Sequence, residues 1–329
     1  MKRISHLVIA SAFAAAAPAF AQQQVVKIDG SSTVFPITEA VAEEFQKAKK
    51  QQIKVTVGIS GTGGGFKKFC RGETDISDAS RPILKSEMAE CAKANIEYYE
   101  LPVAFDALTV VINPKNNFIK QLTIAEMKKM WEPAAQGKVM RWNQVNPQWP
   151  DQPMKLFGPG ADSGTFDYFT EAVVGKSKSS RGDFTASEDD NVLVQGVSRD
   201  VNGLGYFGYA YYVENKDKLK AVPIVNDKGQ AVAPSMESVE KGTYAPLSRP
   251  IFIYVNAKSL GKPEVKEFVE YYMKHGSNLA REVKYVPLPD AAYKTALEHV
   301  QKGKKGTVFG GVAEVGVTIE ELLKREAGL

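Results

Sequence analysis

Histidine is scarce in this 329-residue sequence, which contains only His6, His275 and His299. None of the three stands at the spacing of a metal site or of a nucleophile and its base, and serine or threonine hydroxyls without an adjacent base are poor nucleophiles. His275 precedes Gly276 at an expected helix end, where an imidazole would face the negative end of the helix dipole. The shortage of histidine therefore favours a binding protein over an enzyme.

Cysteine is equally rare, with only Cys70 and Cys91 in the chain. Two cysteines without histidine partners do not match metal-site spacings, although a metal site or a reactive thiol remains the alternative. In an exported chain the simplest interpretation is one disulfide, and closing a loop of this length stabilises the fold by roughly 3 kcal/mol in the chain-entropy model.

Long apolar runs are absent after the first residues. Residues 1–21 combine a basic start, an apolar stretch and a small-x-small end, which predicts a secretory signal peptide cleaved before Gln22. No cysteine follows the predicted cleavage site, so we do not expect a lipoprotein, and no later run approaches the ~20 residues of a membrane span. We therefore expect a soluble protein in the periplasm.

Excess charge of one sign is also missing. Removing residues 1–21 takes away Lys2 and Arg3 and no acidic side chain, which lowers the formal charge from +4 to +2. A near-neutral surface gives no electrostatic reason to expect nucleic acid as a partner. About 308 mature residues are enough for two ordinary domains, and two domains invite a cleft between them.

The pattern that is present alternates short β-type runs with helix-type runs from residue 25 onward. The predicted strands are 25–29, 53–59, 74–79, 96–104 and 107–114, and the predicted helices are 36–50, 65–72 and 86–94. This alternation predicts an α/β fold with a largely parallel sheet. In such sheets ligands bind where the carboxyl ends of strands lead into helices.

The second part of the chain has its own α/β character. We expect helices at 123–131 and 163–174, strands at 154–158 and 204–213, and a polar hairpin at 225–232. The apolar run APLSRPIFIYVNA near residue 250 resembles ELPVAFDALTVVINP near residue 107, as two strands crossing between lobes would. The predicted division is therefore discontinuous, with 22–105 plus 252–329 as one lobe and 106–251 as the other. Amphipathic helices at 262–276 and 291–303 would cover the first lobe.

Three polar segments share one chemistry: GSST at 30–33, GTGGG at 61–65 and DSGT at 162–165. Each lies between a strand-like run and a helix-like run. Unpaired backbone amides at the positive end of a helix suit an oxyanion, although each segment alone would be explained as a helix cap. Three such segments in one chain favour convergence on a single anion.

Two other motifs carry little weight. The glycine loop at 61–65 is not followed by the Lys-Ser/Thr of a P-loop, and the Gly-x-Gly-x-x-Gly pattern at 203–208 leads into aromatic sequence instead of a helix, which argues against a dinucleotide. The tripeptide Arg181-Gly182-Asp183 is the only hint of a surface-adhesion role.

The segments GSSTVFP, GTGGGFKKFCRGETDISDASRP and FGPGADSGTFDYF, together with the two crossing strands, resemble the periplasmic phosphate-binding proteins. These are the solute receptors of bacterial phosphate ABC transporters, and the resemblance covers nearly the whole mature chain. It implies a type II periplasmic binding fold in which two lobes close on one phosphate by a hinge. It implies no reaction and no cofactor.

The resemblance also implies which residues bind. Hydroxyls and backbone amides of the three segments would hold the phosphate oxygens, with one carboxylate just outside them: Ser32, Thr33, Val34, Thr62, Gly63, Ser163, Gly164, Thr165 and Asp162.

The sequence departs from the family pattern at two positions. Pro159 stands where the family has an arginine, and Ser80, followed by Arg81, aligns with a family aspartate. We expect Arg81 to meet the anion in a bidentate way as a relocated guanidinium, the alternative being a surface or hinge arginine. Phosphate keeps a proton near neutral pH and sulfate does not, so an acceptor carboxylate favours phosphate. Asp162 or Asp78 is expected to supply that acceptor or to pair with Arg81.

The sequence thus predicts a monomeric, non-catalytic receptor that delivers inorganic phosphate to a membrane permease. The same fold binding sulfate, molybdate or an organophosphate is the nearest alternative. An exported phosphohydrolase is less favoured, because no metal site or nucleophile and base pair is found.

Overall fold

A mixed β-sheet runs through the whole molecule. The computed structural model describes residues 24–329. The strand order is β2-β1-β3-β12-β4-β8-β6-β7, and β9 pairs with β4 off this path. The strands are β1 (Gln24–Gly30), β2 (Ile53–Ile59), β3 (Ile76–Ala79), β12 (Ser248–Asn256), β4 (Tyr98–Ile112), β8 (Gly203–Gly208), β6 (Lys155–Pro159), β7 (Thr185–Ser187) and β9 (Lys220–Ala221).

The two long central strands, β4 and β12, join the halves of the sheet. They pair antiparallel from Ser248 opposite Ala107 to Asn256 opposite Tyr98, and every residue of both strands is buried. The sequence predicted two strands at 96–104 and 107–114, whereas the structure has one. The strand continues through the polar Asp106 because Arg249 lies directly opposite it and neutralises its charge.

Parallel pairing is confined to each half of the sheet. The strand β1 is parallel to β2 and β3, and β6 is parallel to β7 and β8. The pairs that involve the crossing strands are antiparallel: β12 with β3 and with β4, and β4 with β8. The α/β class is confirmed, but the expected largely parallel sheet is mixed, because each crossing strand runs against its neighbours.

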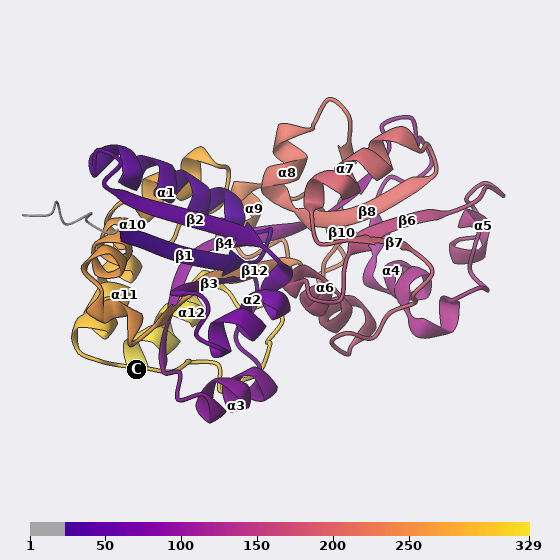
Figure 1. Cartoon of the computed structure of the whole chain (residues 1–329). Helices are drawn as coiled ribbons and strands as arrows, with labels where there is room; N and C mark the ends of the chain where they lie inside the picture. Colours follow the sequence, from indigo (N-terminus) through magenta and orange to yellow (C-terminus); the bar gives the residue numbers. More distant parts are fainter. Residues whose placement is uncertain (1–23) are drawn as a thin grey trace, which may run out of the picture.

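Elements from both ends of the chain share one half of the molecule (Figure 1). The C-terminal helices lie in that half beside the first strands. Its helices are α1 (Phe35–Ala48), α2 (Gly61–Cys70), α3 (Lys85–Lys93), α10 (Pro263–Glu282), α11 (Asp290–Gln301) and α12 (Ile319–Gly328). The lobe boundaries given above, at 105/106 and 251/252, stay a prediction.

The other half is built around β6, β7, β8 and the end of β4 (Figure 1). Its core includes Trp131, whose ring contacts Phe169, Phe184 and Tyr206 edge to face. A small second sheet orders β11-β10-β5. The elements are β5 (Leu122–Thr123), α4 (Ile124–Trp131), α5 (Trp142–Val145), α6 (Gly164–Phe169), which continues as a π-helical segment over Thr170–Val174, α7 (Asp190–Arg199), α8 (Tyr209–Glu214), β10 (Ile224–Val225), β11 (Ala231–Val232) and α9 (Met236–Glu240).

Three expected element boundaries are wrong. The helix expected over 65–72 is Gly61–Cys70, so the glycine segment at 61–65 is its first turn and not a loop. The helix α10 does not end near Gly276 but continues to Glu282, so His275 is not at a helix terminus. Gly276 lies within the helix and allows close packing against α11, because a Cβ there would stand 3.0 Å from the Tyr293 ring. The strand expected over 204–213 ends at Gly208, after which the aromatic residues form α8.

The disulfide and the glycine pattern agree with the sequence predictions. Cys70 and Cys91 form the predicted disulfide. The Gly-x-Gly-x-x-Gly pattern is the buried strand β8. In the described part of the chain no helix is long and apolar enough to cross a membrane, and no cluster of His, Cys, Asp and Glu could hold a metal. The predicted signal peptide lies outside the described residues.

Candidate anion-binding site

The first polar segment, between β1 and α1, has more hydroxyls than its helix cap uses. Gly30 has a φ of 150°, and a Cβ there would collide with the backbone of Asp78, whose carbonyl accepts the Ser31 amide. The Ser31 hydroxyl accepts the Thr33 amide at 3.2 Å and satisfies the local turn. The side chains of Ser32 and Thr33 are therefore free to point elsewhere.

Both of these hydroxyls point to the other half of the molecule. Thr33 Oγ1 lies 2.9 Å from Thr165 Oγ1, and Ser32 Oγ lies 3.5 Å from the carboxylate of Asp190. The Val34 backbone amide, which the family resemblance assigns to the anion, donates to the Ser31 carbonyl at 3.2 Å in this structure. The segment thus joins residues more than 130 positions apart in the sequence.

The second polar segment opens α2. Thr62 Oγ1 lies 3.1 Å from Ser80 Oγ and also accepts the Ser80 amide. The Gly63 amide donates to the carbonyl of Asp162 at 2.8 Å. A Cβ on Gly164 would stand 2.4 Å from Thr62 Oγ1 and 2.6 Å from Ser80 Oγ, so only glycine permits this approach of the second and third segments.

The third polar segment opens α6. Ser163 Oγ accepts the amides of Thr165 and Phe166, so this hydroxyl is the helix N-cap that the simpler interpretation of the sequence requires. Thr165 Oγ1 is not used in the cap. It contacts Thr33 from the first segment and accepts a hydrogen bond from Arg249 Nη2 at 2.7 Å.

The structure therefore brings the three segments together. Their hydroxyls form one buried polar cluster at three helix N-termini, where backbone amides and helix dipoles favour negative charge. The hydroxyl-bearing residues, each at most 4% exposed, are Ser32, Thr33, Thr62, Ser80, Ser163 and Thr165.

Arg249, which the sequence analysis did not single out, is the guanidinium nearest these hydroxyls. It is 1% exposed, and its Nη2 lies 2.7 Å from Thr165 Oγ1, 3.4 Å from Thr33 Oγ1 and 3.2 Å from Asp106 Oδ2. Its Nη1 donates to the Gly164 carbonyl, and its Nε has no partner among the described residues. Burial raises the pKa of Asp106, and Arg249 acts in the opposite direction. A cation thus lies between the first and third segments.

Asp190, at the start of α7, is a second residue that sequence reasoning missed. Its side chain is fully buried, and one oxygen faces Ser32 while the other has no hydrogen-bond partner in the described part of the chain. Burial, followed by the charge of Asp106, raises the pKa of Asp190 to about 7, and Arg249 opposes the shift. Near neutral pH this carboxyl can therefore act as a hydrogen-bond donor or as an acceptor.

Arg81 is buried but engaged with carboxylates. Its Nη1 and Nη2 donate to both oxygens of Glu87 at 2.8 Å, and its Nε donates to Asp167 at 2.6 Å. Burial lowers the pKa of the Arg81 guanidinium, but the carboxylates of Glu87 and Asp167 outweigh this effect and raise the pKa above its ordinary value. The bidentate partner in the structure is thus Glu87, whereas the sequence analysis assigned that role to the anion.

The expected carboxylates occupy other positions. Asp162 is half-buried and pairs with Lys67 at 2.8 Å. Asp78 is fully buried, accepts the Thr38 hydroxyl, and has its pKa raised well above the usual range by burial. Neither contacts Arg81 among the described residues, so the expected pairing is wrong, and the expected acceptor role stays a prediction.

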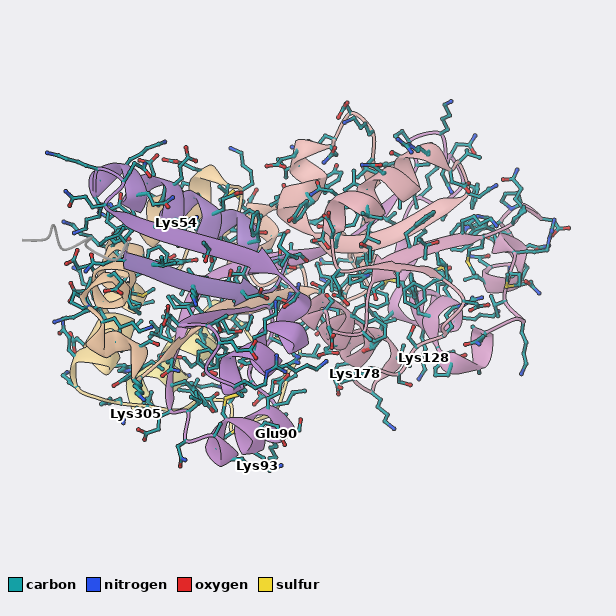
Figure 2. The ribbon with its side chains drawn as sticks, viewed as in Figure 1. Lys54, Glu90, Lys93, Lys128, Lys178 and Lys305 are labelled. Atoms are coloured by element: carbon teal, nitrogen blue, oxygen red, sulfur yellow. A yellow bond between two sulfur atoms is a disulfide. The ribbon has the colours of Figure 1, made fainter. Side chains whose placement is uncertain are left out.

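The remaining motifs have structural explanations. Arg181 is buried and donates to the carbonyls of Met130 and Val139 and to Asp183, so the Arg-Gly-Asp tripeptide does not present its arginine to solvent. His299 lies 3.4 Å from Glu326, between α11 and α12. The side chains labelled in Figure 2 are five lysines and one glutamate, which lie on both halves of the molecule.

Comparison with protein families and curated sequences gives consistent matches. Residues 14–275 match the family model described as a PBP superfamily domain. The chain is 56% identical to protein SphX of Synechococcus elongatus over 94% of this chain and 90% of that one. It is 40% identical to the phosphate-binding protein PstS of Staphylococcus haemolyticus, over 85% and 86%.

Solved structures are similar as well. A possible phosphate-binding protein from Planctomyces limnophilus is 49% identical, with a TM-score of 0.62 over 85% of this chain and 98% of that one. A putative phosphate ABC transporter substrate-binding protein from Clostridium perfringens, solved with bound phosphate, is 25% identical, with a TM-score of 0.67 over 81% and 100%.

Proposed function

Because the chain belongs to the PBP superfamily and to the family of the phosphate-binding protein PstS, we propose that it is an extracytoplasmic receptor for inorganic phosphate. It captures the anion between the two halves of the molecule and delivers it to the permease of an ABC transporter. The protein acts as a monomer, without a cofactor and without catalysing a reaction on its ligand.

The observation that carries this proposal is the contact between Thr33 and Thr165. Their hydroxyl oxygens are 2.9 Å apart, although one belongs to the segment before α1 and the other to α6. A tetrahedral oxyanion accepts several hydrogen bonds at once, so hydroxyls from two facing loops are suited to it. The buried cluster also excludes water, which strengthens each hydrogen bond to a charged ligand.

Arg249 supplies the positive charge in this proposal. It replaces the arginine that the family places four residues before the Ser-Gly-Thr segment, where this chain has Pro159. Its Nε, which has no partner within residues 24–329, and its Nη2, which donates to Thr165, are the two guanidinium nitrogens proposed to donate to the anion. Arg81 keeps its carboxylate partners and does not contact the ligand.

Asp190 is our proposed acceptor for the phosphate proton. One oxygen of Asp190 contacts Ser32 and the other has no partner in the part of the chain that the structure describes, whereas Asp162 is half-buried and paired with a lysine. A carboxylate there favours protonated phosphate and repels sulfate, which has no proton to donate. An Asp190→Asn protein should therefore lose preference for phosphate over sulfate. Asp162→Asn tests the acceptor expected from the sequence in the same titration.

Export by the predicted signal peptide, without lipid attachment, would place the receptor in the periplasm. The absence of a cysteine after the predicted cleavage site supports the unlipidated form. Mass spectrometry of the processed protein tests this point, because a lipid would add a fixed mass to the N-terminal residue.

Calorimetric titration of the purified mature protein tests the function directly. We expect phosphate to bind with micromolar or tighter affinity and sulfate, molybdate and a phosphate monoester to bind far more weakly. If one of these other anions binds more tightly than phosphate, the fold is retained and the assigned ligand is wrong. If phosphatase activity is found and is lost in Thr165→Ala, the chain is an enzyme and the receptor proposal fails.

A further inference from the structure

A buried ion cluster joins the two halves of the molecule beside the candidate site. Arg81 follows β3, whereas Asp167 lies in α6, and their side chains are 0% and 1% exposed. Glu87, in the first turn of α3, completes the cluster with a bidentate contact to Arg81. Lys178 Nζ lies 3.9 Å from the other oxygen of Asp167. We name Arg81, Glu87 and Asp167 the interlobe ion cluster.

The cluster is adjacent in sequence to the proposed binding residues on both sides. Arg81 directly follows Ser80, whose hydroxyl contacts Thr62. Asp167 lies two positions after Thr165 on the same short helix. Any movement that separates Thr165 from the first half must therefore also pull Asp167 away from Arg81.

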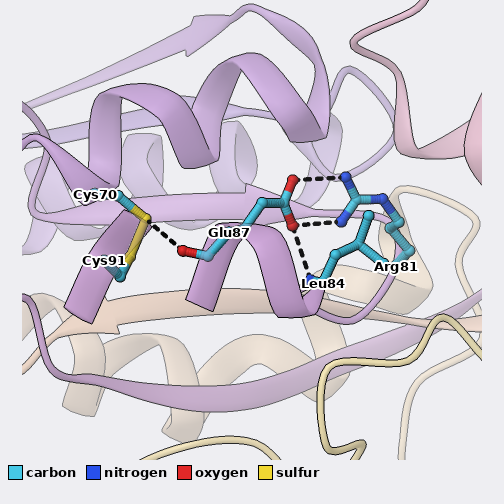
Figure 3. Close-up of a disulfide and its surroundings, with 5 residues drawn as sticks. All are labelled: Cys70, Arg81, Leu84, Glu87 and Cys91. Atoms are coloured by element: carbon cyan, nitrogen blue, oxygen red, sulfur yellow. Dashed lines mark hydrogen bonds and ion pairs between the residues drawn. A yellow bond between two sulfur atoms is a disulfide. The ribbon is translucent and has the colours of Figure 1, made fainter. Parts of the chain in front are cut away.

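The first half holds Arg81 in a fixed position (Figure 3). Glu87 Oε2 also accepts the Leu84 amide at the start of α3, so the carboxylate that binds Arg81 is itself oriented by the helix terminus. The Cys70–Cys91 disulfide joins the ends of α2 and α3, and Cys70 Sγ lies 3.5 Å from the Glu87 carbonyl. The guanidinium is therefore positioned before α6 arrives.

Separation of the halves changes the environment of both charges. In the structure Asp167 is buried, and burial raises its pKa while Arg81 lowers it. When the halves separate, both side chains become hydrated, so neither is a buried charge without a partner. Asp167→Asn weakens the one charged contact that crosses between the halves, and Arg81→Gln leaves Asp167 buried without its closest cation. Both changes destabilise the closed form and not the open one, in which the groups are hydrated.

We propose that the ion pair between Arg81 and Asp167 is a latch that favours the closed form and so strengthens retention of the anion. The two residues are positioning residues and do not touch the ligand. This inference rests on the proposed function for its ligand, but the cluster itself is independent of which anion binds.

The sign of the effect separates a latch from simple electrostatics. Asp167 is negative and lies near an anion site, so removing its charge strengthens anion binding if only the local field matters. A latch gives the opposite result, because Asp167→Asn removes the charged acceptor of Arg81 Nε across the two halves, while Glu87 still pairs with the terminal nitrogens of Arg81 within the first half. We expect phosphate to bind Asp167→Asn roughly tenfold to a hundredfold more weakly, on the scale of one hydrogen bond to a charged group.

The experiment is calorimetry and stopped-flow kinetics with phosphate on the mature wild type, Asp167→Asn, Arg81→Gln and the double variant. The latch predicts that phosphate dissociates faster from the single variants than from the wild type, while its association rate changes little. It also predicts that the double variant loses less phosphate-binding free energy than the two single variants lose together. Unchanged or tighter phosphate binding by Asp167→Asn overturns the latch. Additive losses also overturn it, because they show that the two residues act separately.

Asp183→Asn is the matched control. Asp183 pairs with the buried Arg181, but both residues lie in the same half, so breaking this pair costs stability without affecting closure. An equal loss of affinity in this control would show that general destabilisation explains the result and would overturn the latch.

Failure of the proposed function is distinguishable from failure of the latch. If wild-type protein does not bind phosphate, the proposed function is wrong. Small-angle scattering then tests whether the Arg81–Asp167 pair favours the closed form. A larger radius of gyration for Asp167→Asn than for wild type supports it, and equal radii overturn it. If Arg81→Gln fails to fold, the conservative Asp167→Glu variant, which keeps the charge, should bind more tightly than Asp167→Asn.

Discussion

Replacing Thr165 with valine removes one hydroxyl from the centre of the proposed site and keeps the branched shape of the side chain. In the structure that hydroxyl contacts Thr33 Oγ1 at 2.9 Å and accepts Arg249 Nη2 at 2.7 Å. Both neighbours are buried, so neither can regain water when the hydroxyl is lost.

The size of the effect follows from the charge of the ligand. A hydrogen bond to a charged group contributes about 1.5–3 kcal/mol, and 1.4 kcal/mol is a factor of ten in affinity. Thr165→Val should therefore bind phosphate roughly tenfold to a hundredfold more weakly than wild type. The folded state should also lose stability, because Arg249 and Thr33 lose a partner.

Thr170→Val separates these two effects. Thr170 lies in the helical continuation of α6 and is fully buried, but its hydroxyl donates to the carbonyls of Phe166 and Asp167 and not to the cluster. Calorimetry should show weaker phosphate binding for Thr165→Val only, while urea unfolding shows a stability loss for both. If both variants bind phosphate as the wild type does, the hydroxyls do not hold the anion and the site assignment is refuted.

Three further predictions concern charge and covalent structure. Since the folded pKa of Asp190 is raised to about 7, the free energy of unfolding should fall as pH rises from about 4 through 7. Asp190→Asn should remove this pH dependence in urea unfolding and raise the free energy of unfolding near pH 8 by at most about 4 kcal/mol. An unaltered pH profile would contradict this prediction. Replacing Cys70 and Cys91 with serine should lower the free energy of unfolding by about 3 kcal/mol, and an unchanged urea midpoint would refute that. Arg249→Lys should keep a charge beside Asp106 yet bind phosphate at least about tenfold more weakly by calorimetry, since the planar fork is lost, and wild-type affinity would exclude Arg249.

Local sequence predicted much of the architecture because strand and helix periods are local properties. The strand at 53–59 and the polar hairpin near Gly229 are present as expected, since a β-branched run and a turn glycine act over a few residues. The residues after Gly208 show where local signals fail. Their aromatic side chains favour strands, yet they form α8, whose first amide donates to Asp106 and whose Tyr211 hydroxyl reaches the Ser32 carbonyl.

The positions of the polar segments could also be predicted, because glycine and hydroxyl residues at strand-to-helix junctions have a local signature. The partners of the charged side chains could not. Arg249 was visible within a predicted crossing strand, but its place opposite Asp106 depends on the pairing register of β12 and β4. Arg81 was placed near the site by its neighbours, yet its partners Glu87 and Asp167 come from helices whose approach no short sequence pattern encodes.

A crystal structure of the mature protein grown with phosphate would locate the bound anion directly. We predict one phosphate between the N-termini of α1 and α6, within hydrogen-bond distance of the Thr33 and Thr165 hydroxyls and of Arg249, with Arg81 still bound to Glu87 and Asp167. Phosphate bound elsewhere, or contacted by Arg81 in place of Arg249, would contradict the account.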